Sequence, residues 1–503
     1  MTDMKDDDTK LDVNNPQELL EYIQKLKAEN ARLESSSRLG LNFENTPDEN
    51  VVRYSTRVPL SAHEPENDVM TDDNGITHDL IIGDNYPGLL TLLPKYEGKI
   101  NVIYIDPPYN TGNNDFIYND RYTNPEDSYK HSKWLSFMEP RLKMAARLLS
   151  DDGIIFISID DHEQARLKLL MDGIFGERNF VNDFIWVNNL KGRQLSNGGA
   201  VKTYEHILLY RNMNIRNFVI PTDMALKSMP IIYRNKDYEV HNDEYGDYVL
   251  KNELYNSNSK FNEDTCPSLV FNIYYNGEDV RFTDASDDDD IPGYTLIRPH
   301  HNNDGFHKYH AWRWSKEKIA NGIHDLEFIH HDNTYRIYTK IRKFDTTSFK
   351  DIIMGISTGN IDSIMGKHMF DFPKPVQLLK TLLRTSSGGD SIILDFFAGS
   401  GTTGQAVAEL NAADGGYRHC ILITDEGKNV DDPSAVNIAR DITHTRLQRV
   451  LTGRDWADGK EHPSLNQNLR THHLTSVSTM KQDGVNKRAT DDIIMDIIDD
   501  LYH

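Results

Sequence analysis

The chain has 503 residues, 38% of them hydrophobic and 10% aromatic, which indicates a folded protein of several domains rather than a disordered one. Its formal net charge of −23 at pH 7 argues against a protein that coats nucleic acid indiscriminately, because such binding depends on a basic surface. Cys266 and Cys420 cannot form a disulfide framework or a four-cysteine zinc site. No apolar run reaches the length of a membrane span, and we expect a cytoplasmic protein.

Residues 1–75 predict a helix followed by a linker. Asn14 offers an N-cap and Pro16 a first-turn proline for a helix that runs to about residue 33. Apolar residues at heptad spacing, with Asn30 in the same seam, are typical of a dimerising helix. The same stripe would also suit a helix that packs on its own domain. We expect a homodimer, and a weakly patterned connector from 42 to 73.

Residues 76–190 alternate between apolar runs and stretches with helical spacing. A strand with a turn is predicted at 78–85, further strands at 100–105 and 153–159, and a helix at 134–149. This alternation predicts a parallel sheet that is covered by helices on both faces.

The pattern changes between residues 191 and 364, where strands become shorter and more polar and aromatic and basic residues mix. The earlier pattern resumes at 365–450, where Lys374-Pro375 opens a helix, and residues 451–503 form a C-terminal extension. The fold class that we expect is α/β: a doubly wound, mostly parallel sheet with an inserted α+β domain. The extension ends in a predicted helix at 490–502, which could dock another subunit, bind a second copy or pack on its own chain.

The first chemical candidate is the tetrapeptide Asp106-Pro107-Pro108-Tyr109, which follows the predicted strand at 100–105. Each proline fixes its own φ and restricts the residue before it, so the loop is expected to hold one shape. It presents one carboxylate, backbone carbonyls and an aromatic face, a combination that suits a flat heterocycle with an amino group. A strand that simply ends in a proline turn is the alternative.

The second candidate is the glycine-rich turn at 399–404, which follows the apolar run at 392–397. Gly399-x-Gly401-x-x-Gly404 matches the dinucleotide-binding fingerprint, and Asp425 or Glu426 ends the next predicted strand at the spacing of a ribose contact. A nicotinamide cofactor and S-adenosylmethionine fit this turn equally well. No Lys-Ser/Thr pair follows the glycines, which argues against ATP hydrolysis.

Together the two stretches resemble the Mod subunits of type III restriction-modification systems and related β-class DNA adenine methyltransferases. In those enzymes, too, the catalytic loop precedes the glycine turn and a recognition insertion lies between them. The resemblance covers about residues 80–210 and 367–426, and it is carried by the segments 105–119, 130–135, 156–161, 173–180 and 203–210.

The resemblance implies an S-adenosylmethionine-dependent, Rossmann-like methyltransferase whose catalytic residues are Asp106, Pro107, Pro108 and Tyr109. It implies that the cofactor is bound by Asp84, Asn85, Lys374, Pro375, Asp395, Phe397, Gly399, Gly401, Thr402, Thr403, Asp425 and Glu426. For Asp84 a second interpretation is that the side chain only caps the following helix.

The chemistry of adenine suits the Asp106 loop. The lone pair of the exocyclic N6 is delocalised into the ring, and acceptors aimed at its hydrogens favour a tetrahedral, nucleophilic nitrogen. We expect the Asp106 carboxylate and the Pro107 carbonyl to be these acceptors, with Tyr109 stacked on a base flipped out of double-stranded DNA. Related cytosine-amino enzymes more often carry Ser in place of this Asp. Ring-carbon methylation is excluded, because it needs a cysteine after proline and Cys266 precedes one.

The inserted domain is expected to choose the DNA sequence. Candidate contacts with phosphates or bases are Lys191, Arg193, Arg298, Arg313, Arg336 and Arg342. The histidines at 300–310 have no second ligand cluster, and no metal site is expected. The sequence contains no helicase or nuclease motif, so restriction would require a separate Res-type helicase-nuclease subunit; otherwise the enzyme would be a solitary methylase.

Three other functions stay open. A nicotinamide-dependent oxidoreductase would explain the glycine turn but not the Asp106 loop. A DNA-binding regulator could keep both features without transferring a methyl group, and an RNA or cytosine target would keep the same chemistry.

Overall fold

The computed structural model describes residues 43–44, 46, 48–54, 57–112, 117–118, 121–122, 127–189, 200–213, 218–229, 239–287, 289–342, 346–427 and 436–478. The helices expected at 14–33 and 490–502 lie outside these residues. The chain forms two compact units, of which unit 1 comprises 1–220, 227–230 and 348–503, and unit 2 comprises 221–226 and 231–347. No helix among the described residues is long and apolar enough to span a membrane.

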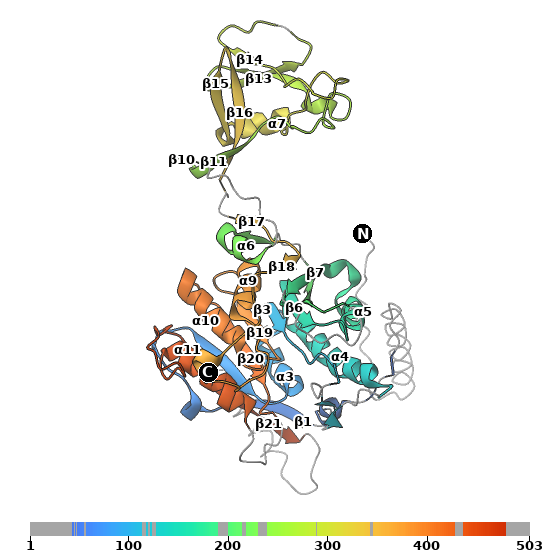
Figure 1. Ribbon diagram of the computed structural model, residues 1–503, viewed down its shortest axis with the longest axis vertical. Helices are drawn as coiled ribbons and strands as arrows, with labels where there is room; N and C mark the ends of the chain where they lie inside the picture. Colours follow the sequence, from blue (N-terminus) through green and yellow to red (C-terminus); the bar gives the residue numbers. More distant parts are fainter. Residues whose placement is uncertain are drawn as a thin grey trace, which may run out of the picture. The chain divides into compact units, whose positions relative to one another are not determined.

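Unit 1 is built on a ten-stranded sheet (Figure 1). The strands of this sheet are β1 (Arg57–His63), β2 (Thr77–Ile82), β3 (Ile100–Ile105), β6 (Leu149–Ile159), β7 (Phe180–Val187), β8 (Tyr204–Arg211), β18 (Ile352–Ile353), β19 (Ile392–Asp395), β20 (His419–Thr424) and β21 (Asn468–Ser478). Their order is β1-β21-β2-β20-β19-β3-β6-β8-β7-β18. The strands from β21 to β6 in this order run parallel, whereas β1 and β8 are antiparallel to their neighbours. The mostly parallel sheet expected from the sequence is therefore confirmed.

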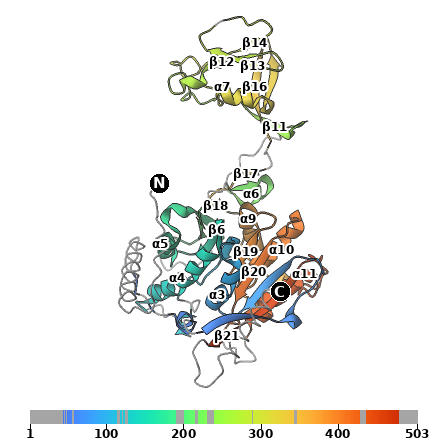
Figure 2. The same ribbon diagram turned by 180° about the vertical axis from the view of Figure 1, so that it is seen from behind.

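Helices cover both faces of this sheet. These covering helices are α3 (Asn85–Tyr96), α4 (Lys130–Leu148), α5 (Gln164–Phe175), α9 (Val376–Ser386), α10 (Thr402–Asp414) and α11 (Thr445–Thr452), and unit 1 also contains the short helices α2 (Glu49–Arg53) and α8 (Asp362–Met365). The buried side chains of α3, α4 and α5 share one core, and those of α9, α10 and α11 share another. The two sets of helices lie on opposite sides of the sheet in both views (Figures 1 and 2). The sheet is thus doubly wound.

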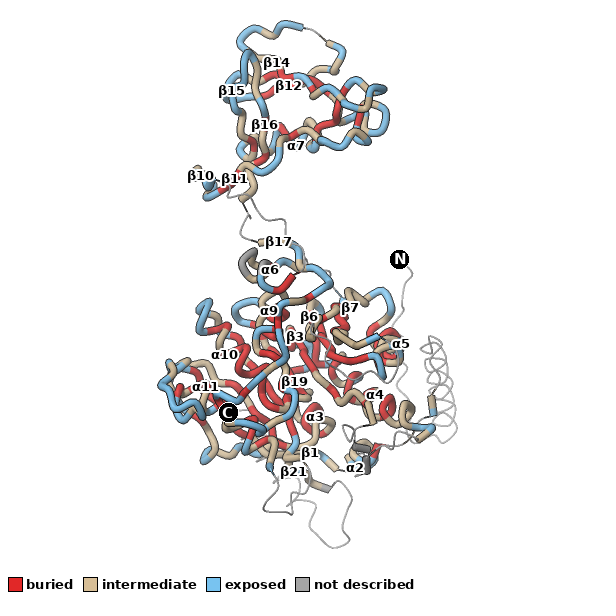
Figure 3. Tube along the Cα trace, in the orientation of Figure 1, coloured by how far each residue is buried: buried red, intermediate tan, exposed pale blue. Residues whose placement is uncertain are grey.

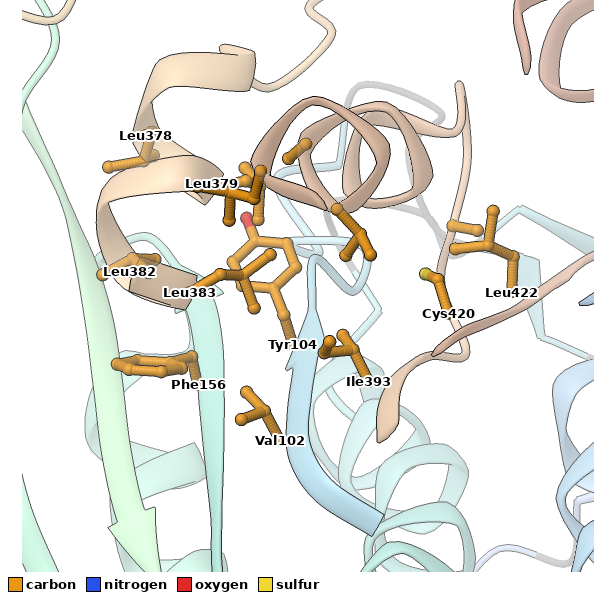
Figure 4. Close-up of a cluster of buried hydrophobic side chains, with 14 of the residues drawn as sticks. Val102, Tyr104, Phe156, Leu378, Leu379, Leu382, Leu383, Ile393, Cys420 and Leu422 are labelled. Atoms are coloured by element: carbon orange, nitrogen blue, oxygen red, sulfur yellow. The ribbon is translucent and has the colours of Figure 1, made fainter. Parts of the chain in front are cut away.

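The central strands are buried on both faces, as the red segments in the middle of unit 1 show (Figure 3). Successive side chains of a strand point to opposite faces, so Val102 and Tyr104 of β3 enter the core beneath α9 (Figure 4), whereas Ile103 and Ile105 enter the core beneath α4. Burial on both sides explains why the sequence of β3 is continuously apolar. It also makes β3 a fixed support for the loop that follows it.

Two regions that the sequence presented as peripheral belong to the sheet. The expected connector at 42–73 contains α2 and β1, and the expected extension from 451 contains β21, which pairs with both β1 and β2. Both predictions were wrong in this respect. As an edge strand that carries Pro59 and keeps only intermediate and exposed positions, β1 has no continuous apolar run that would identify it.

Further short elements lie outside the ten-stranded sheet. They are the strands β4 (Ile117–Tyr118), β5 (Arg121–Tyr122), β9 (Val219–Pro221) and β17 (Thr346–Ser348) and the helix α6 (Thr222–Ser228).

Unit 2 has two small sheets and a core of its own. It contains β10 (Val240–Asp243), β11 (Gly246–Glu253), β12 (Phe271–Tyr275), β13 (Val280–Asp284), β14 (Thr295–Ile297), α7 (Lys316–Asn321), β15 (Leu326–His331) and β16 (Thr334–Ile341). The sheets have the orders β10-β11-β16-β15 and β13-β12-β14, and Phe271, Trp312 and Ile337 belong to the shared core. The unit is shorter than the insertion expected at 191–364, because β8, β18 and α8 belong to unit 1.

Candidate active site

Five neighbouring parallel strands of unit 1 end at the same edge of the sheet, and each leads into an aspartate. In spatial order the strands are β2, β20, β19, β3 and β6. The acids are Asp84, Asp425, Asp395, Asp106 and Asp160. The two stretches that the sequence singled out are therefore adjacent in space, although almost three hundred residues separate them.

The strands β3 and β19 also mark the point where the connections of the sheet diverge. From β3 the chain continues through α4 to β6 on one side, and from β19 it continues through α10 to β20 on the other. Because α4 and α10 cover opposite faces, the carboxyl ends of these two strands form a topological switch point, which is where open α/β sheets bind ligands. Asp106 and Asp395 lie at this point.

The Asp106 loop is fixed by hydrogen bonds to side chains. The indole Nε1 of Trp134 donates to the Pro108 carbonyl oxygen at 2.7 Å, and the hydroxyl of Tyr109 lies 3.0 Å from Asp106 Oδ1. Asn110 follows with a left-handed φ of 57°. The loop is thus held from α4 as well as from its own strand.

Buried Glu163 anchors the residue after the loop. Its Oε1 accepts a hydrogen bond from Asn110 Nδ2 at 2.6 Å and lies 2.5 Å from His131 Nδ1. Burial raises the pKa of the Glu163 carboxyl. The sequence did not single out Glu163, because its partners Asn110 and His131 lie 53 and 32 residues away in the chain.

Lys374 and Glu205 converge on the Asp106 loop. Lys374 Nζ lies 2.6 Å from the Tyr109 hydroxyl, 2.6 Å from Glu205 Oε2 and 3.4 Å from Asp106 Oδ1. The Tyr109 hydroxyl lies 2.9 Å from Glu205 Oε2. The structure thus brings Lys374 to the Asp106 loop, whereas the resemblance had grouped it with the cofactor residues. The neighbouring Pro375 precedes α9 as its N-cap.

Burial and charge act against each other in this group. Burial raises the pKa of Asp106, and the Lys374 ammonium opposes that rise. Burial disfavours the charged form of Lys374, but the carboxylates of Asp106 and Glu205 together raise its pKa. Glu205 lies in the segment 203–210 that supported the resemblance, yet nothing in the sequence alone indicates its contact with Lys374.

The glycine turn lies at the end of β19 and opens α10. Gly399 and Gly401 have φ values of 49° and 77°, a left-handed conformation that glycine adopts without strain. Asp395 Oδ1 accepts a hydrogen bond from the Phe397 amide at 3.0 Å, and its Oδ2 accepts one from the Thr403 hydroxyl at 2.5 Å. Burial raises the pKa of Asp395 to about 7.

A buried arginine supports this turn from α11. Arg446 donates from Nη1 to the Ser400 carbonyl oxygen at 3.0 Å and to the Thr402 hydroxyl at 2.8 Å, and from Nε to Gln405 Oε1 at 2.9 Å. Burial lowers its pKa to about 9. Sequence reasoning missed Arg446, because a buried arginine on an amphipathic helix has the same local pattern as an exposed one.

Asp84 and Asn85 are tied to another buried arginine. Asp84 caps α3 by accepting a hydrogen bond from the Tyr86 amide at 2.8 Å, as one interpretation of the sequence had expected. Arg141 of α4 lies 3.3 Å from Asp84 and donates to Asn85 Oδ1 at 2.5 Å and to Asp48 Oδ2 at 3.1 Å. The start of α3 is therefore fixed beside the edge that carries Asp395.

The acids that follow β20 differ in their partners. Glu426 Oε1 accepts hydrogen bonds from Asn437 Nδ2 at 3.1 Å and from Arg440 Nε at 3.3 Å. Asp425 caps the turn to Gly427, and burial raises its pKa, with the charges of Asp84 and Glu426 adding to the effect. Asp425 lies close enough to Asp84 for their charges to interact.

The candidate DNA contacts of the inserted domain fall into three groups. Lys191 and Arg193 lie outside the described residues. Arg298, Arg313 and Arg336 are exposed in unit 2. Arg342 is half-buried and forms ion pairs with Asp243 and Asp325, both at 2.7 Å.

Comparison with known proteins agrees with these features. The family model described as DNA methylase matches residues 100–426. The chain is 33% identical over 414 residues to the Mod subunit of the type III restriction-modification enzyme EcoPI of Escherichia phage P1, covering 74% of this chain and 62% of the relative. It is 30% identical over 414 residues to the StyLTI Mod subunit of Salmonella typhimurium, covering 75% of this chain and 58% of the relative.

A third relative matches over a larger share of its own length. The type II methyltransferase M.KpnI of Klebsiella pneumoniae is 30% identical over 382 residues, which cover 74% of this chain and 87% of the relative. The two Mod subunits extend further, since the match spans only about three fifths of each. On the family match and on this relative, the chain belongs to the DNA methylase family.

Proposed function

We propose that this chain transfers the methyl group of S-adenosylmethionine to the exocyclic N6 of adenine in a specific sequence of double-stranded DNA. One observation carries the proposal: the Asp106 loop and the glycine turn at 399–404 follow the adjacent parallel strands β3 and β19. Methyl transfer requires the amino nitrogen and the methyl donor to lie within bonding reach of each other, so their two sites must be neighbours.

The acids of the sheet edge fit this cofactor. Asp395 and Asp425 are carboxyls whose pKa values burial raises, and a cationic ligand would favour their ionised forms. We assign Asp395, Phe397 and the turn of Gly399 and Gly401 to the methionine and ribose end, with Asp425 accepting from the ribose hydroxyls. When bound, S-adenosylmethionine would supply an electrophilic methyl group.

Asp106 and Pro107 act on the target base. Their carboxylate and carbonyl oxygens accept from the amino hydrogens of adenine, which favours a tetrahedral nitrogen with an available lone pair. The carboxylate of Asp106 is also suited to take the proton that the nitrogen must lose. The ring of Tyr109, whose hydroxyl contacts Asp106, Glu205 and Lys374, stacks on the base.

The base reaches this loop only if it leaves the duplex. Unstacking costs a few kcal/mol, which stacking and hydrogen bonding in the pocket offset. We assign sequence readout to the insertion, with exposed Arg298, Arg313 and Arg336 as contacts, and we keep Lys191 and Arg193 as candidates. Arg342 is the weakest candidate, since Asp243 and Asp325 already pair with it.

Two partners complete the proposal. The Mod subunits among the relatives are named as parts of type III restriction-modification enzymes, and a Res-type helicase-nuclease is the corresponding partner here. A homodimer is the second expectation. Size-exclusion chromatography with light scattering, with and without a co-expressed Res-type subunit, tests both.

The test of the main proposal is transfer of labelled methyl to DNA, followed by nucleoside analysis. We expect N6-methyladenine from the wild type, and a rate reduced by at least about 100-fold in Asp106→Asn, with cofactor binding retained. Asp161→Asn is the matched control, because Asp161 lies at the same edge but pairs with Lys202 and His206. Near-normal transfer by Asp106→Asn would overturn the assignment.

The same assay separates the other functions. Methylated cytosine or methylated RNA would move the target and keep the chemistry. DNA binding without transfer would indicate a regulator. Tight binding of a nicotinamide cofactor, without affinity for S-adenosylmethionine, would indicate an oxidoreductase.

A further inference from the structure

The ion pair of Lys374 and Glu205 lies against the catalytic carboxylate, and adenine binding alone does not require it. Lys374 comes from the segment before α9 and Glu205 from β8, and both reach the Tyr109 hydroxyl. The ammonium of Lys374 lies 3.4 Å from Asp106 Oδ1. Both partners are largely buried, with side-chain exposures of 10% and 20%.

Glu205 fixes the position of this ammonium. Its Oε2 lies 2.6 Å from Lys374 Nζ, and its Oε1 accepts a hydrogen bond from Asn188 Nδ2 at 2.8 Å. Both oxygens of Glu205 are therefore engaged. Asn188 therefore holds the Glu205 carboxylate in place against Lys374.

In the proposed reaction Asp106 takes the proton that the amino nitrogen of adenine loses, so its carboxyl must be ionised. Its surroundings work against that state. The groups that face it within the described part of the chain are Tyr104, Tyr109, Glu205, Asp395 and Lys374. Two of these are phenols and two are acids, so Lys374 is the one cation among them. A base in the pocket would bury the carboxylate further and disfavour its charge.

We propose that Lys374, positioned by Glu205, keeps Asp106 ionised while adenine occupies the pocket. This inference rests on the proposed function. Lys374 and Glu205 are positioning residues, because they act through Asp106 and Tyr109 rather than on the base.

The two members of the pair should shift the pH profile in opposite directions. The positive charge of Lys374 lowers the pKa of Asp106 and the negative charge of Glu205 raises it. Since transfer needs ionised Asp106, Lys374→Met should move the acid limb of the rate profile to higher pH, by about 1–3 units. Glu205→Gln should move it to lower pH, because glutamine still accepts from Lys374 but carries no charge.

The experiment measures the single-turnover rate of methyl transfer against pH with the full chain, DNA and S-adenosylmethionine. Lys374→Arg should restore the wild-type acid limb, because it keeps the charge. Lys380→Met is the matched control, since it breaks a lysine–glutamate pair of 2.8 Å between α9 and α10 at another place. Its profile should match that of the wild type.

Unshifted acid limbs in Lys374→Met and Glu205→Gln would overturn the inference, even if both rates fall. If Lys374→Met does not fold, by circular dichroism, Glu205→Gln alone decides. The carboxyl of Asp106 is also titrated by 13C NMR in the free protein, with its signal assigned by Asp106→Asn. Its pKa should rise in Lys374→Met and fall in Glu205→Gln, and both shifts can be measured even if the wild type transfers no methyl to DNA, an outcome that would overturn the proposed function.

Discussion

Asp395 occupies an unusual place for a carboxyl group, since it is almost fully buried at the end of β19 beside the glycine turn. Burial and the nearby charge of Asp106 raise its pKa to about 7, although the Thr403 hydroxyl and the Phe397 amide stabilise the ionised form. We therefore expect the group to be divided between its two protonation states in the free protein near neutral pH. A cationic cofactor would select the ionised one.

We expect the affinity for S-adenosylmethionine to depend on pH through Asp395. Below pH 7 a proton must leave before the cation binds, so the affinity should fall by up to about tenfold per pH unit, and it should level off above pH 7. Isothermal titration calorimetry on both sides of pH 7 measures this effect. Asp395→Asn should bind more weakly above pH 7 and show a flat profile. A flat profile in the wild type would contradict the assignment.

At the scale of elements, the segment that carries Lys374 depends on a glycine. A Cβ added at Gly359 would lie 1.9 Å from the Pro373 carbonyl oxygen and 2.7 Å from the Lys374 carbonyl carbon. Neither backbone atom is the end of a flexible side chain. Any side chain at 359 must therefore displace the segment that brings Lys374 to the Asp106 loop.

We expect Gly359→Ala to lower the free energy of unfolding by about 1–3 kcal/mol and to reduce the rate of methyl transfer. Urea unfolding and the single-turnover rate measure the two effects. Gly389→Ala is the control, because its added Cβ would approach only the Gly416 Cα, at 3.8 Å. Equal behaviour of the two variants would show that the packing at Gly359 does not matter.

Elements with a strong local pattern could be predicted from the sequence. The apolar runs of β3 and β19, the cap and helix after Asp84, and the helix after Lys374-Pro375 all agree with the structure. In each case the signal lies within one segment, because burial on both faces or a turn residue determines the local sequence. The strand β1 had no such signal, since its exposed positions and its partner β21 are set by the sheet.

The site could be predicted only where a motif marks it. Asp106 and Asp395 lie in the motifs, but Glu205, Arg141 and Arg446 are single charged residues whose partners are brought together by the fold. Arg446 reaches Ser400, and Arg141 reaches Asp48 and Asp84. Contacts across such distances leave no periodic pattern in a single sequence.

For the whole molecule, the division into two units predicts that the two units unfold separately. Unit 2 has its own core around Phe271, Trp312 and Ile337, and the candidate cofactor residues belong to unit 1. A ligand that binds one native unit stabilises that unit, by about 2.7 kcal/mol at a concentration of 100 times its Kd.

We therefore expect two transitions in differential scanning calorimetry of the full chain. S-adenosylmethionine should raise the temperature of one transition and leave the other in place. Asp395→Asn, which weakens the proposed cofactor site, should reduce this shift. A single transition that shifts as a whole would show that the two units unfold together.

The strand order of unit 1 has a consequence for the synthesis of the protein. β2 emerges early from the ribosome, but its partners in the sheet, β20 and β21, are encoded more than three hundred residues later. β3 can pair at once with β6, whereas its other edge waits for β19. Unpaired strand edges invite association with other chains. A growing chain therefore exposes the edges of β2 and β3 until its last third is made, and a product that ends before β19 lacks the proposed cofactor site.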